Sequence, residues 1–115
     1  MTGPSVWQSF VPVLDICILY VYDRDMRVVW DPRKASSNYR KHGIRFSDGE
    51  MILFDPNALT REDTVAQGEQ RFVSVGTDST GRILVVAYAY RGENIRLISA
   101  RAATGRERKA YEEGI

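Results

Sequence analysis

The side chains best able to do chemistry in this chain are cations and hydroxyl groups spread between residues 41 and 111. Metal-free RNA cleavage needs a base for the 2′-hydroxyl proton, cations for the charge growing on the phosphorane oxygens, and an acid for the leaving 5′-oxygen. Arginine suits the second task because its guanidinium offers two parallel N–H donors. The residues of these types are Lys41, His42, Arg71, Arg82, Tyr88, Tyr90, Arg96, Arg101, Arg106, Arg108 and Tyr111.

Each of these residues also has a structural interpretation. A single histidine at a helix end more often caps or packs than reacts. Arg71 and Arg101 can form ion pairs on a sheet, for instance Arg101 with Glu107, and tyrosines in strands are usually core residues. The residue types therefore leave three classes open: an enzyme, a binding module, and a subunit that only holds another chain.

Other chemistries have little support in the sequence. One histidine and one cysteine give no cluster with the spacing of metal ligands. The glycines at 76, 81 and 92 are turn glycines without a phosphate-binding loop, and no nucleophile elbow is present. We therefore expect neither a cofactor nor a metal site.

The composition predicts one globular domain. A chain of 115 residues with 43% hydrophobic and 27% charged residues can build a single core. The net charge is only +1, so positive charge must be local, as it is between Asn94 and Gly105, where no acidic residue occurs. The lone Cys17 excludes an internal disulfide and favours the reducing cytoplasm. No apolar run is long enough to span a membrane.

Capping signals predict three helices. Asp31 and Pro32 begin a helix that runs to His42 and ends at Gly43 in the left-handed conformation. Ser47 and Glu50 suggest a capping box for a short second helix, and Thr104 with Glu107 suggests one for a basic C-terminal helix.

Alternating patterns predict the strands. A short strand at 27–30 precedes the helices, a weak one spans 58–62, and stronger ones span 71–76, 82–90 and 95–102. The turns at 78–81 and 91–94 are too short for anything but an antiparallel meander. The predicted fold class is α+β: a short N-terminal strand and two helices, then an antiparallel β-meander and a C-terminal helix.

If the turns at 78–81 and 91–94 are symmetric, they fix the pairing register of the three strong strands and therefore which side chains share a face. We expect one face to be covered by the early helices and the other by the C-terminal helix, the N-terminal arm or a second protein. One face would hold Arg71, Val73, Val75, Leu84, Val86, Tyr88, Tyr90, Leu97, Ser99 and Arg101. The other would hold Phe72, Ile83, Val85, Ala87, Ile98 and Ala100.

Residues 1–25 differ from the rest, because their apolar residues follow no clear period and Pro12 interrupts them. They form either an arm against the sheet, for example a strand at 16–22, or translated upstream DNA before a natural start at Met26. We treat 1–25 as an extension of a domain at 26–115.

Two separated motifs support a family assignment. The first runs Trp30-Asp31-x-x-Lys34-x-x-x-Asn38-x-x-Lys41-His42-Gly43-x-x-Phe46, and the second comprises Arg71, residues 98–102 and Glu107-Arg108-x-x-Tyr111. The chain from Met26 to Tyr111 resembles the BrnT toxins of bacterial type II toxin–antitoxin systems. The resemblance implies a RelE-like ribonuclease fold, arrest of translation by RNA cleavage, and neutralisation by a BrnA-type antitoxin, which alone contacts DNA.

The roles of the residues follow from their chemistry. We expect His42 to be the acid or base, Arg71 and Arg101 to stabilise the phosphate, and Tyr111 to transfer a second proton or stack on a base. Backbone-contacting cations would be Lys41, Arg82 and Arg96. The alternative is a non-catalytic module of the same fold that binds RNA or a protein.

Overall fold

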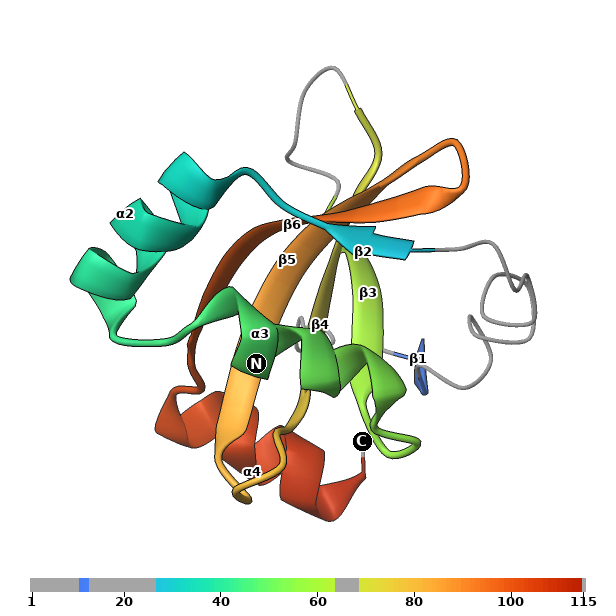
Figure 1. Ribbon diagram of the computed structural model, residues 1–115. Coiled ribbons are helices and arrows are strands. Elements are labelled where there is room, and N and C mark those ends of the chain that lie inside the picture. Colours follow the sequence, from blue (N-terminus) through green and yellow to red (C-terminus); the bar gives the residue numbers. More distant parts are fainter. Residues whose placement is uncertain (1–10, 13–26, 64–68, 115) are drawn as a thin grey trace.

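The computed structural model describes residues 11–12, 27–63 and 69–114. Its centre is a six-stranded sheet in the order β1-β3-β4-β5-β6-β2, antiparallel throughout except that β2 runs parallel to β6 (Figure 1). The elements are β1 (Val11–Pro12), β2 (Arg27–Val29), α2 (Pro32–His42), α3 (Phe46–Glu50), the 3-10 helix η2 (Met51–Phe54), β3 (Leu59–Asp63), β4 (Arg71–Thr77), β5 (Ile83–Arg91), β6 (Asn94–Ala102) and α4 (Gly105–Glu113). The predicted α+β class and the antiparallel meander are confirmed.

Helix α2 begins and ends, and helix α4 begins, as their capping residues predict. The Asp31 carboxylate accepts a hydrogen bond from the Arg33 backbone N–H at 2.8 Å, and Gly43 ends α2 with φ 72°. At α4, the Thr104 hydroxyl accepts from the Glu107 N–H, and the Glu107 carboxylate accepts from the Thr104 N–H. Each cap satisfies a helix-end group that lacks an intrahelical partner.

The predicted Ser47–Glu50 capping box is wrong. The N-cap of helix α3 is Arg45 rather than Ser47, so the helix begins two residues earlier than predicted, at Phe46, and no side chain caps it. Packing explains the difference: Phe46 is buried in the core, and a Cβ on Gly49 would come within 3.0 Å of Ala100 and Val86. The helix start is therefore determined by contact with the sheet rather than by the local cap.

Helices cover the two faces of the sheet unequally. On the first face, α2, α3 and η2 enclose the main core, which includes Phe46, Ile52, Leu84, Val86, Tyr88 and Leu97. On the second face, α4 covers one end, where Leu59, Val75 and Val85 form a smaller cluster (Figure 1). The other end of this second face carries partly buried and exposed side chains.

The predicted sharing of faces is wrong for β4 and for the end of β6. Thr77 pairs with Ile83, which leaves five residues in the β4–β5 turn rather than four and moves Arg71 and its facemates off the core face. Asp78 holds this longer turn by accepting hydrogen bonds from Thr80 and Arg82.

A bulge next to Tyr88 causes the second error. The pairing of β5 with β6 shifts by one residue between Ala87 and Tyr88. Leu97 therefore stays on the core face as predicted, whereas Ser99 and Arg101 turn to the second face. As a result, Arg71 and Arg101 do share a face, but it is the second face, and Arg101 lies at the end that α4 covers.

Part of the N-terminal extension contacts the sheet. Val11 pairs with Thr60 and Pro12 with Leu59, so β1 extends the sheet beyond β3. The strand predicted at 16–22 and the proposed start at Met26 lie outside the described residues. No helix among the described residues is both long and apolar enough to cross a membrane.

Candidate functional site

A buried asparagine holds the first helix against the edge of the sheet. The Asn38 side-chain NH₂ donates to the Ala100 carbonyl at 2.8 Å and to the Ile44 carbonyl at 3.1 Å, and its side-chain oxygen accepts from the Ala100 N–H at 3.1 Å. Strand β2 pairs with β6 only as far as Arg96. Beyond that point the Asn38 side chain supplies the hydrogen bonds that the Ala100 backbone would otherwise make to a neighbouring strand. The end of α2 is thereby held beside the strand that carries Arg101.

Lys41 and His42 lie in this last turn of α2, and both are exposed. His42 follows Asn38 by four residues and so lies one helical turn further along the same side. Neither side chain forms a hydrogen bond or ion pair with the rest of the described chain. Between Asp31 and Asp48 there is no acidic residue, so α2 and the segment after it present only positive charge.

Arg101 forms an ion pair with Glu107 in the first turn of α4. Its guanidinium makes two bonds to the Glu107 carboxylate, at 2.7 and 2.8 Å, and Glu107 is only 3% exposed. Burial by itself raises the pKa of Glu107, but the hydrogen bonds from Arg101 and Thr104 outweigh it and lower the pKa. The same contact raises the pKa of Arg101. The structural interpretation of Arg101 is thus confirmed, although 38% of its side chain stays exposed.

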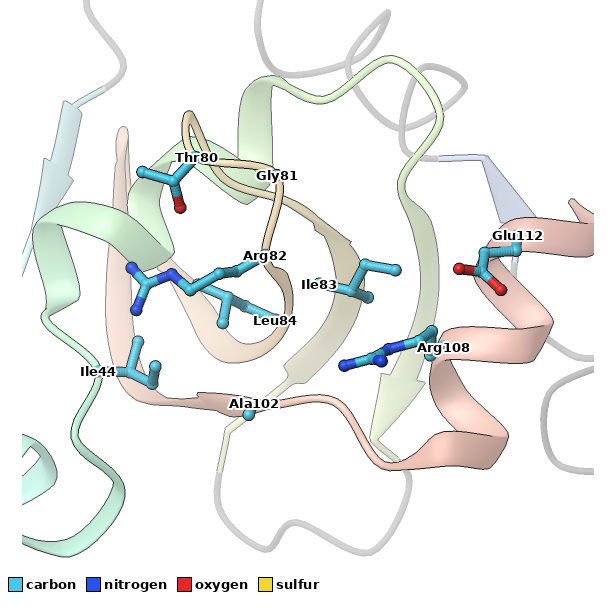
Figure 2. Close-up of a pocket in the computed structure, with 9 residues that line it drawn as sticks. All are labelled: Ile44, Thr80, Gly81, Arg82, Ile83, Leu84, Ala102, Arg108 and Glu112. Atoms are coloured by element: carbon cyan, nitrogen blue, oxygen red, sulfur yellow. The ribbon is translucent and has the colours of Figure 1, made fainter.

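A hollow of about 470 Å³ lies next to these residues (Figure 2). Ile44, Ala102, Arg82 and Arg108 line it, and Arg108 extends its guanidinium into it from α4. Arg82 is paired with Asp78 at 2.8 Å and Asp48 at 2.9 Å. Arg108 has no ion pair among the described residues. The hollow is therefore bordered by two arginines and by the Glu112 carboxylate, and Arg108 is a guanidinium without an ion pair among the described residues.

Of the seven predicted site residues, Arg82 lines this hollow. His42 is two residues before the lining residue Ile44, with Lys41 before it, and Arg101 immediately precedes the lining residue Ala102. Because side chains alternate along a strand, Arg101 leaves the second face, whereas Ala102 lies on the first face opposite Leu84.

Tyr111 lies away from this hollow and forms a hydrogen bond with Asp55. Its hydroxyl donates to the Asp55 carboxylate at 2.6 Å, and the Thr77 N–H donates to the same oxygen at 2.9 Å. Burial by itself raises the pKa of Asp55, but the hydrogen bonds from Tyr111, Thr77 and Asn57 leave the pKa lowered. Burial and the bond to Asp55 raise the pKa of Tyr111. Its ring borders a second hollow, of about 520 Å³.

Arg71 and Arg96 lie together at the opposite end of the second face, where both contact Glu69. In the ladder, Arg71 stands level with Ala89 and Arg96, whereas Arg101 stands level with Val85, four residues along β5. At about 3.4 Å per residue, the two levels are roughly 14 Å apart. The two arginines predicted to stabilise one phosphate are therefore separated.

Sequence reasoning missed Asn38, Asp55 and Glu69 as contact points. Asn38 lies inside the first motif, which was the available signal for it. The two carboxylates carry no local signal, since each acts on residues brought near only by the fold. Among the described residues, no three of His, Cys, Asp or Glu are grouped as a metal site would require.

Comparisons with known proteins identify the family of the chain. Residues 30–107 match the family described as "Ribonuclease toxin, BrnT, of type II toxin-antitoxin system". The crystal structure of the Brucella abortus ribonuclease toxin BrnT is similar, with 27% identity and a TM-score of 0.53 over 69% of this chain and 97% of that one. A search of curated proteins finds no match.

Proposed function

Because the chain belongs to the BrnT family of ribonuclease toxins of type II toxin–antitoxin systems, we propose that it is a metal-independent endoribonuclease that arrests translation in the cytoplasm. The observation that carries the proposal is the end of α2, where the exposed Lys41 and His42 follow Asn38, which is bonded to β6 at Ala100, next to Arg101. Asp31, Asn38, Gly43 and Phe46 of the first motif have structural tasks in capping or packing. Lys41 and His42 have none among the described residues, which leaves them available for RNA.

The chemistry we propose uses the end of α2 together with Arg101 as the reaction site. The His42 imidazole takes the 2′-hydroxyl proton or returns a proton to the leaving 5′-oxygen. Arg101 stabilises the charge on the phosphorane, with its guanidinium oriented by Glu107. Lys41 and Arg82 hold the flanking backbone.

More distant residues bind other parts of the RNA. Arg71 and Arg96, roughly 14 Å away along the sheet, contact a different phosphate. Tyr111 borders a hollow and its hydroxyl donates a hydrogen bond to Asp55, which favours base stacking over proton transfer among its two predicted roles.

The partner we propose is a BrnA-type antitoxin. The family description places these proteins in two-component systems. An antitoxin that covers the open half of the second face would occlude Arg71 and Arg96. Hydrogen exchange in β4, β5 and β6 should then slow when antitoxin is added. Contact with DNA would come through the antitoxin alone.

A specific observation favours the second candidate, a non-catalytic binding module. Arg82, Arg101 and Tyr111 already have internal partners, and His42 is the only histidine. Such a protein would hold RNA or another chain by charge without cleaving it.

Single-turnover cleavage of a short RNA in EDTA separates the two. We expect wild type to cleave, and His42→Gln to be slower by about 100-fold or more. The matched control is Arg33→Gln, at the other end of α2, which should stay within a few-fold of wild type. Intact RNA with wild type favours the binding module, and a near-wild-type rate for His42→Gln defeats the role assigned to it.

A further inference from the structure

Three arginines at the end of the second face point toward a single carboxylate. Arg71, Arg91 and Arg96, here called the arginine cluster, come from β4, β5 and β6. Arg71 and Arg96 flank Ala89 in the ladder, and Arg91 follows Ala89 by two residues, so all three leave the same face. Because the three positions belong to paired strands, the backbone beneath the cluster is held rigidly.

Glu69 is the residue they contact. Its Oε2 lies 2.6 Å from Arg96 Nη2 and 3.4 Å from Arg71 Nε, and its Oε1 lies 3.6 Å from Arg91 Nε. The hydrogen bond from Arg96 keeps the pKa of Glu69 below its usual value despite some desolvation. The carboxylate is therefore charged at neutral pH. Together with Asp63, which lies opposite Arg71 in the ladder, it gives this end of the face two carboxylates against three arginines.

We propose that the arginine cluster is a binding site for an RNA phosphodiester and that Glu69 is an internal stand-in, which the RNA displaces. This inference rests on the proposed function. A phosphodiester carries one negative charge and two free oxygens, as the carboxylate does, so it can take over the same donors. Arginine pairs with either anion in the same forked geometry.

Two features indicate that the carboxylate can be exchanged. Glu69 lies in a bend before β4, outside the ladder, so it can move without breaking strand pairing. The Nε of Arg96 is buried and has no hydrogen-bond partner among the described residues, so the cluster retains a donor that Glu69 does not satisfy.

The competing explanation is that Glu69 positions the arginines for their ligand. The two ideas predict opposite signs. A stand-in lowers affinity by occupying the site, whereas a positioning residue raises it. If Glu69 fills the site nine times in ten, the apparent Kd for RNA is about tenfold higher than without it.

The test measures binding of a short 2′-O-methyl RNA, which cannot be cleaved, by fluorescence anisotropy at fixed salt. We expect Glu69→Gln to bind about tenfold tighter than wild type. The matched control is Glu93→Gln, an exposed charge in the β5–β6 turn without an ion pair in the described chain, which should change Kd by no more than about twofold. Glu69→Asp keeps the charge but shortens the side chain, and it should also bind more tightly.

A second readout separates this inference from the proposed function. Inorganic phosphate should raise the Tm of Glu69→Gln more than that of Glu93→Gln, because a ligand that binds the folded state stabilises it. If phosphate does so while no variant binds RNA, the anion site stands and the RNA function fails.

Other results overturn the inference. If the Glu69→Gln variant binds RNA no more tightly than the Glu93→Gln variant, Glu69 does not compete with RNA for the cluster, even if the protein cleaves RNA. The gain should also vanish in an Arg96→Gln background, and a gain that persists there places its source outside the cluster. If Glu69→Gln does not fold, Glu69→Asp decides by the same criteria.

Discussion

The contact between Arg101 and Glu107 gives the most demanding test of the proposed site, because Arg101 would both stabilise the fold and act on the RNA phosphate. Arg101→Lys keeps the charge but can retain only one of the two hydrogen bonds. A charged hydrogen bond contributes about 1.5–3 kcal/mol. Because 38% of the Arg101 side chain is exposed, screening reduces this value, and we expect a loss of about 1–1.5 kcal/mol in the free energy of unfolding.

Thermal unfolding followed by circular dichroism measures the first part. For a domain of this size, about 1 kcal/mol lowers Tm by roughly 4–8 °C, so Arg101→Lys should unfold about 5–10 °C below wild type. Glu107→Gln breaks the same contact, and the double variant should lose less than the sum of the single losses. An unchanged Tm, or strictly additive losses, would refute the energetic reasoning.

The cleavage rate, measured where both proteins are folded, tests the second part. If Arg101 contacts the phosphate, Arg101→Lys should lose far more activity than its stability loss explains. Glu107→Gln keeps the guanidinium but weakens the contact that orients it, so it should lose less activity than Arg101→Lys. A rate for Arg101→Lys within a few-fold of wild type would show that Arg101 holds α4 and does not act on RNA.

Three further outcomes are expected. Asn38→Leu removes three buried hydrogen bonds at the sheet edge and should cost about 2–4 kcal/mol in urea unfolding; a loss below 1 kcal/mol would contradict that role. Asp55 and Glu107 have folded pKa values below their usual 3.8 and 4.5, so the stability they add is complete above those values and lost as pH falls through the folded ones. Asp55→Asn should therefore flatten the acid side of the stability profile, and an unchanged slope would count against it. A chain beginning at Met26 loses only the β1 pairing among described contacts and should still unfold cooperatively, which calorimetry can check.

Local signals in the sequence determined the elements. Asp31 with Pro32, Gly43, and the Thr104–Glu107 box act over a few residues, so both ends of α2 and the start of α4 could be predicted directly. The order of the elements and the short turns likewise required an antiparallel meander. These features depend on backbone chemistry that is the same in any fold, which is why sequence reasoning reached them.

The placement of the candidate site depended on tertiary contacts. One extra residue in the β4–β5 turn and one bulge beside Tyr88 moved Arg71 and Arg101 to the second face, because strand side chains alternate and a shift of one residue reverses them. Glu69 contacts Arg96 of the arginine cluster, and Tyr111 contacts Asp55, although each pair is far apart in the sequence. The sequence by itself thus specified which helices and strands form and which cations are available, whereas only packing decided which carboxylate each cation meets.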